Sequence, residues 1–136
     1  MPVTIYKQTQ TPKGTQVIKP ETAKQMREMM VSITRKGGTG QDGAVPGYDV
    51  AAKTGTARKA SAGGYADKYR ASFVGFAPAQ NPRLIVAVSI DEPVGSYYGG
   101  TVAGPVFRGI MEGGLKLLNV APTYVNADKN VQTAQR

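Results

Sequence analysis

The chain has 136 residues, 40% of them hydrophobic, and a formal net charge of +8, which suits one globular domain with its own core. Cysteine and histidine are both absent, which excludes disulfides and argues against a zinc site, and we expect no cofactor. The 17 Lys and Arg residues are scattered and no nucleic-acid motif accompanies them, so we do not expect nucleic acid binding. No apolar run approaches the ~18 residues of a membrane span, and we expect neither an anchor nor a signal peptide in this chain.

The first part of the chain predicts a small hairpin followed by a helix. Residues 3–7 and 15–18 are short β-like runs on either side of a turn that contains proline and glycine. A helix is predicted over residues 20–35, because a proline suits its first turn and apolar residues recur at helical spacing. Its apolar face consists of Ala23, Met26, Met30 and Ile33. The glycine-rich stretch 37–47 should end the helix and form a loop.

Three strands are predicted in the middle of the chain, at residues 50–58, 69–77 and 84–90. Residues 59–67 should form a hairpin connection between the first two strands that is longer than a tight turn. Residues 84–90 are nearly all apolar and β-branched, which is typical of a central strand covered on both faces. We predict an α/β (α+β) fold with an antiparallel three-stranded meander and flanking helices, in which 50–58 is the outer strand.

A last helix is predicted to begin near residue 100 and to lie on the sheet. The apolar face assigned to it consists of Val102, Val106, Phe107, Ile110, Leu117 and Leu118. Residues 123–136 are polar and without a period, so we expect a mobile tail. The folded unit is then predicted to be residues 1–122.

The polar residues of the first predicted strand are more than its fold requires. In an extended segment Thr54 and Thr56 point to one face, while Lys53 and Gly55 point to the other. An edge strand with two hydroxyls, a nearby ammonium and a glycine suits an extended peptide that ends in a carboxylate. The alternative is a strand end with a solvated lysine. A phosphate-binding loop is disfavoured, since Ala52 occupies its second glycine position.

Residues 53–56, Lys-Thr-Gly-Thr, resemble the K-[ST]-G-T motif of penicillin-recognising serine acyltransferases. The stretches that extend this resemblance are 47–52, 73–79, 90–93, 97–100 and 103–107. Together they are similar to the C-terminal part of a class B penicillin-binding protein of the septal, cell-division type, over residues 2–122. The resemblance implies the C-terminal part of a penicillin-binding-protein/serine β-lactamase-like fold. In that fold the sheet has five strands, and 84–90 pairs with a strand from the N-terminal part of the domain, so an isolated chain should self-associate through this edge.

The resemblance also implies roles for single residues. Lys53 and Thr56 would be catalytic: Lys53 contributes positive potential near a nucleophile, and the Thr56 N–H is an oxyanion-hole donor. The implied substrate-binding residues are Thr54, Gly55, Thr56, Arg58, Tyr69, Tyr97 and Tyr98. The hydroxyls of Thr54 and Thr56 would hold the carboxylate of a β-lactam or of a terminal D-alanine, and the aromatic rings would wall the pocket for the acyl side chain.

Acyl transfer in this family also requires S-x-x-K and S-x-N elements, and the sequence contains neither. The chain by itself should therefore be inactive. The resemblance implies part of a peptidoglycan D,D-transpeptidase that cross-links septal cell wall and binds β-lactams. The full-length protein would act at the periplasmic face of the inner membrane, with stem peptides and division-machinery proteins as partners. The alternatives are a fragment of a D,D-carboxypeptidase or β-lactamase, and a non-catalytic peptide-binding module.

Overall fold

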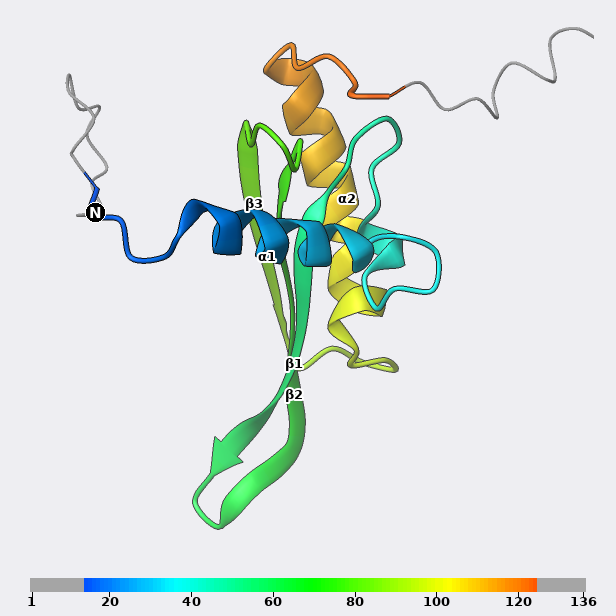
Figure 1. Ribbon diagram of the computed structural model, residues 1–136. Coiled ribbons are helices and arrows are strands. Elements are labelled where there is room, and N and C mark those ends of the chain that lie inside the picture. The colour runs from blue at the N-terminus through cyan, green and yellow to red at the C-terminus, as the bar shows by residue number, and fades with distance from the viewer. Residues whose placement is uncertain (1–13, 125–136) are drawn as a thin grey trace, which may run out of the picture.

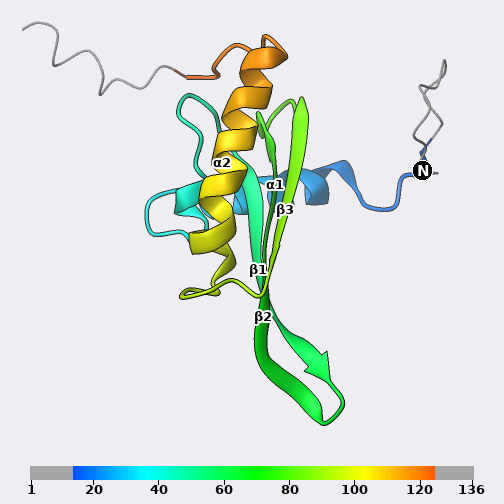
Figure 2. The ribbon, with the colours of Figure 1, turned by 180° about the vertical axis from the view of Figure 1, so that it is seen from behind.

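The structure, a computed structural model, describes residues 14–124 and consists of a three-stranded sheet with a helix on each face (Figure 1). The elements in chain order are α1 (Pro20–Ser32), the short 3-10 helix η1 (Gln41–Gly43), β1 (Ala51–Ser61), β2 (Gly64–Ala77), β3 (Leu84–Asp91) and α2 (Gly99–Leu117). The strands are antiparallel in the order β1-β2-β3, so the predicted meander is confirmed. Seen from behind, α2 runs along the sheet, while α1 crosses its other face (Figure 2).

The main core lies between the sheet and α2. Its largest fully buried side chains include Phe73 of β2 and Phe107 of α2, whose ring centroids are 4.6 Å apart. A smaller cluster on the opposite face joins Val31 of α1 to Ala51 of β1. Because side chains alternate along a strand, even-numbered residues of β1 face α2 and odd-numbered residues face the α1 side.

The β1–β2 hairpin is longer than the sequence predicted. Both strands continue through the expected 59–67 connection, so that only Ala62 and Gly63 link them. The pairing runs as far as Ser61 opposite Gly64, with a register shift between Arg58 and Ala60. The prediction was wrong because most side chains of this extension are exposed, and an exposed ladder held by backbone pairing leaves no apolar alternation in the sequence.

The expectation that β3 is covered on both faces was also wrong. Val86 points into the core and is 8% exposed, whereas Ile85 on the opposite face is 69% exposed. In the described part of the chain β3 is an edge strand, paired only with β2. The run of apolar residues indicated the strand correctly, but it did not show which face is covered.

Both helices differ from their predictions in detail. α1 ends at Ser32 instead of residue 35, because the next residues bond elsewhere: Thr34 is buried with its hydroxyl 2.9 Å from the Val50 carbonyl, and the Ile33 carbonyl accepts from Gly40 N–H. Met26, assigned to the buried face of α1, is 49% exposed. The buried face of α2 is formed by Ala103, Phe107, Met111 and Leu115. Most of the apolar face predicted for α2 is exposed: Val106, Ile110, Leu117 and Leu118 are 46%, 51%, 86% and 47% exposed.

The two ends of the described region bear on the remaining predictions. Residues 15–18 do not form a strand, so the predicted N-terminal hairpin is not formed there, and its first run, 3–7, lies outside the described residues. Thr123 and Tyr124, the first residues of the predicted tail, hydrogen-bond to the Gly47 carbonyl. The rest of that tail, 125–136, is outside the described residues. No helix within 14–124 has both the length and the hydropathy needed to cross a membrane.

The free side of β3 leads to a prediction about association. An edge strand with unpaired backbone groups recruits other chains, so we expect the 136-residue chain to form dimers or larger species at low micromolar concentration. Ile85→Lys should weaken this association without disturbing the core, because Ile85 is mostly exposed. Analytical ultracentrifugation measures it, with Val17→Lys, at an exposed position before α1, as the matched control. A stable 14.4 kDa monomer would contradict the prediction.

Candidate functional site

The candidate site is built on the middle of β1, where Thr54 and Thr56 point toward the N-terminus of α2, as the strand period predicts. The Thr56 hydroxyl oxygen accepts a hydrogen bond from Gly99 N–H at 3.2 Å, and the Thr54 hydroxyl lies 3.4 Å from that of Thr39. A hydroxyl that accepts a bond from a backbone N–H keeps its own proton for another acceptor. Thr56 is therefore held in place by α2 and can still donate to a ligand.

Two glycines at the start of α2 allow the helix to approach β1 this closely. A Cβ on Gly99 would collide with the Ser72 carbonyl and lie 2.5 Å from the Gly55 carbonyl, and a Cβ on Gly100 would collide with the Thr39 carbonyl. All of these obstacles are backbone atoms, which cannot rotate away. Both glycines are fully packed, and they fix the position of the helix N-terminus relative to the two hydroxyls.

Lys53 and Gly55 occupy the alternate positions of β1, as predicted. The Lys53 ammonium donates to the Thr54 carbonyl at 2.7 Å, so the charge lies close to the strand that carries the hydroxyls. Gly55 is paired with Ser72 on β2, whose hydroxyl would meet a Cβ at position 55 at 2.5 Å. A side chain at position 55 would therefore require the Ser72 hydroxyl to rotate away, a constraint that the sequence did not reveal.

The four other predicted site residues come together in one stack beside Thr56. Tyr69 and Tyr97 stack with their centroids 4.2 Å apart and their planes at 11°, and Tyr98 follows at 4.7 Å from Tyr97. The Arg58 guanidinium lies 5.8 Å from the Tyr69 centroid, within the range of a cation–π contact. A side-chain hydrogen bond with Tyr98 is the main cause that raises the pKa of Tyr97. The stack joins the hydroxyl strand through Gly99, which directly follows Tyr98.

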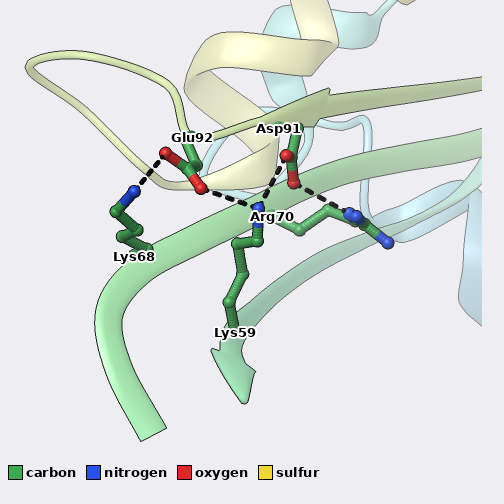
Figure 3. A network of polar contacts seen from close by, with 5 residues as sticks. All are labelled: Lys59, Lys68, Arg70, Asp91 and Glu92. Atoms are coloured by element: carbon green, nitrogen blue, oxygen red, sulfur yellow. Dashed lines mark hydrogen bonds and ion pairs between the residues drawn. The ribbon is translucent and has the colours of Figure 1, made fainter. Parts of the chain in front are cut away.

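Next to this stack is an ion-pair network that the sequence analysis missed (Figure 3). The Lys59 ammonium lies 2.7 Å from both Asp91 and Glu92, while Glu92 also pairs with Lys68 at 2.8 Å and Asp91 with Arg70 at 3.1 Å. The sequence shows the Asp-Glu pair at the end of β3 and a group of basic residues before it, but it does not show which of them pair. The pairing depends on the strand register and on the shift beside Lys59.

The network changes the titration of its members. The bonds to Asp91 and then to Glu92 raise the pKa of Lys59, and Lys59 is the main cause that lowers the pKa of both carboxyls. Since the carboxyl pKa values are lowered in the folded state, the stabilisation by the network is present above their ordinary pKa values and is lost as the pH falls through the folded-state values.

A groove of about 440 Å³ lies between the network and the stack. Its lining residues are Asp67, Lys68, Tyr69, Glu92, Pro93 and Tyr97. Charged groups thus line one part of the groove and aromatic rings another. A ligand with both an apolar and a polar part would match this lining.

The sequence is similar to a protein-family model and to known proteins. It matches the family model described as "Penicillin binding protein transpeptidase domain" over residues 1–112. It is 60% identical over 125 residues to "Probable peptidoglycan D,D-transpeptidase PenA" of Neisseria flavescens. The aligned region covers 90% of this chain and 31% of the relative. It is 40% identical over 132 residues to "Peptidoglycan D,D-transpeptidase FtsI" of Escherichia coli K12, which covers 95% of this chain and 22% of the relative.

The fold is similar to solved structures as well. The apo transpeptidase domain of Burkholderia pseudomallei penicillin-binding protein 3 superposes with a TM-score of 0.77 at 49% identity, over 88% of this chain and 37% of that chain. A structure described as a peptidoglycan glycosyltransferase from Burkholderia ambifaria gives a TM-score of 0.75 at 47% identity, over 89% and 35%. The chain therefore spans between about a fifth and two fifths of the proteins that it matches.

Proposed function

The chain belongs to the penicillin-binding protein transpeptidase family, and from this we propose that it is the C-terminal part of a peptidoglycan D,D-transpeptidase that forms septal cross-links and is acylated by β-lactams. It supplies the strand that binds the acyl donor, while the serine nucleophile lies elsewhere in the full-length protein. The relatives PenA and FtsI are described as D,D-transpeptidases, which disfavours the carboxypeptidase, β-lactamase and non-catalytic interpretations.

The observation that supports this proposal most directly is the arrangement of hydroxyls on β1. In the described sheet β1 is paired on one side only, so its outer edge is available to an extended stem peptide. Thr54 and Thr56 project on the same face of this strand, and the Thr56 oxygen is already engaged by Gly99 N–H. Both hydroxyl protons can be directed to the terminal carboxylate of the donor.

Each predicted site residue has a role in this proposal. The Thr56 N–H stabilises the oxyanion that develops when the serine attacks the donor carbonyl, and Lys53 contributes positive charge at the same strand. Gly55 leaves room for the Ser72 side chain on the neighbouring strand β2. Tyr69, Tyr97 and Tyr98, with Arg58 over the first ring, form the wall beside the acyl side chain.

The proposal extends to the substrates, partners and location of the full-length protein. Stem peptides of peptidoglycan are its substrates, β-lactams are substrate mimics that acylate it, and division-machinery proteins are its partners. It acts in cell-wall synthesis at the periplasmic face of the inner membrane, where changes in this segment would alter cell shape and antibiotic resistance.

The test measures, by stopped-flow, the rate at which penicillin acylates the full-length protein. Thr56→Val should reduce the second-order rate constant roughly 10- to 100-fold, because a hydrogen bond to a charged group contributes about 1.5–3 kcal/mol. Tyr98→Leu should reduce it much less, since the ring only borders the pocket. Thr56→Ser keeps both the acceptor for Gly99 and the donor for the carboxylate, and it should stay near the wild-type rate. Equal losses in Thr56→Val and Tyr98→Leu would refute the assigned roles.

A further inference from the structure

The loop between β3 and α2, residues 92–98, carries two rings of the aromatic stack and is held at both ends. At its far end, Gly99 N–H donates to the Thr56 hydroxyl at 3.2 Å. At its near end, Glu92 N–H donates to the Tyr69 carbonyl at 2.9 Å, while the Glu92 carboxylate lies between two ammonium groups. Between these ends Val94 is 99% exposed. The position of the rings therefore depends on the two attached ends, together with the stacking of Tyr97 on Tyr69.

The near end adopts a conformation that needs support. Glu92 has a φ of 47°, in the left-handed region that residues with a Cβ rarely adopt. It also follows Asp91 directly, so two carboxylates stand side by side where the chain leaves β3. Like charges repel, and without a cation between them the two side chains would separate.

Lys59 supplies that cation from a distant part of the sheet. It lies on β1 and reaches past β2, the strand between, to place its ammonium 2.7 Å from both carboxylates (Figure 3). Its side chain is 29% exposed, whereas Lys68 and Arg70, which each pair with one carboxylate, are 60% and 58% exposed. Lys59 lies at the register shift in β1. Among the described residues, only Lys59 pairs with both acids.

We propose that Lys59 is a positioning residue. By holding Asp91 and Glu92 together, it fixes the point at which the 92–98 loop leaves the sheet. It thereby keeps the rings of Tyr97 and Tyr98 at a constant position relative to Thr56. The inference rests on the proposed function, because a fixed aromatic wall matters to activity only if β1 binds an acyl donor. Exposed ion pairs contribute little to folding stability. Removing Lys59 should accordingly loosen the loop far more than it destabilises the fold.

The first arm of the test measures the loop without reference to activity. In the full-length protein, Lys59→Met should speed hydrogen exchange of the hydrogen-bonded amides at the ends of the loop, Glu92 and Gly99, by about 10-fold in peptides that cover residues 92–99, since the loop opens locally once one end is released. Lys59→Arg should restore protection, because it can again pair with both acids. Lys116→Met removes a different ion pair, to Glu112 on α2, and should leave the loop unchanged. Unchanged exchange in Lys59→Met overturns the inference.

A double-mutant cycle shows whether Lys59 acts through Glu92. Glu92→Gln alone should raise exchange in the same peptides, and Lys59→Met combined with Glu92→Gln should add less than the sum of the single effects. Fully additive effects would mean that the two residues hold the loop independently, and this would also overturn the inference.

The second arm measures acylation by two penicillins that differ in the size of the acyl side chain. Lys59→Met should reduce the rate for the bulky penicillin roughly 5- to 10-fold relative to the small one, because a displaced wall affects only the larger group. Lys59→Arg should restore the ratio. Equal losses for both drugs, or an unchanged ratio while the loop exchanges faster, would overturn the inference. Failure of the wild-type protein to be acylated would refute the proposed function, and the exchange result would still decide the role of Lys59.

Discussion

Replacing Phe107 with Ala is expected to lower the free energy of unfolding by about 3–5 kcal/mol, the usual cost of deleting a large buried ring. The side chain is fully buried, packs 4.6 Å from the Phe73 ring and lies where a Cβ on Gly75 would meet it at 2.9 Å. A domain of this size is stable by only about 5–15 kcal/mol. Urea denaturation of the 136-residue chain, followed by circular dichroism, should therefore show a much lower midpoint.

Ile110→Ala is the matched control on the same helix. Ile110 is 51% exposed, so its truncation should cost less than about 1 kcal/mol. The sequence assigned Ile110 and Phe107 to one apolar face, and the structure separates them. Equal losses of stability in the two variants would mean that α2 is rotated from the orientation described above.

The helix face was not predictable because α2 is apolar on more than one side. Val106 and Ile110 give a pattern at helical spacing on one side, while Phe107, Met111 and Leu115 give a second pattern on the side that packs, so hydrophobicity alone does not choose between them. A Cβ on Gly104 would lie 3.2 Å from Gly43 N in the 3-10 helix η1. The orientation is set by this close approach between distant segments, and local periodicity does not record it.

The strand meander and the alternation of the K-T-G-T residues were predictable from the two-residue period. That period depends only on extended backbone, so Thr54 and Thr56 had to share a face once β1 formed. The ion-pair network, by contrast, was not predictable from a local period. Lys59 and Glu92 are 33 residues apart, and their contact requires the register of two strand pairs and the shift beside Lys59. No local pattern carries that information.

In the sequence, the two glycines at the start of α2 belong to the family stretch 97–100. Their physical role appears when α2 is placed against β1 and the loop that contains Thr39. Gly100 then occupies a position where any side chain meets backbone, and the Thr39 hydroxyl is 3.4 Å from that of Thr54. The same contacts therefore pack the helix against the sheet and position the hydroxyls of the site.

Gly100→Ala is accordingly expected to cost about 3 kcal/mol or more, at the upper end of the range for overpacked sites, because the new methyl group collides with the Thr39 carbonyl. Either α2 or the loop must move, and both contact the hydroxyls of β1, so acylation of the full-length protein should fall as well. Gly109→Ala is the matched control: among the described residues nothing lies within 4 Å of its Cβ, and better helix propensity should stabilise it by up to about 1 kcal/mol. Urea midpoints of the two variants should therefore move in opposite directions from that of the wild type. If Gly100→Ala were instead as stable as Gly109→Ala, the close contact between α2 and the Thr39 loop could not be what holds Thr54 and Thr56 in place.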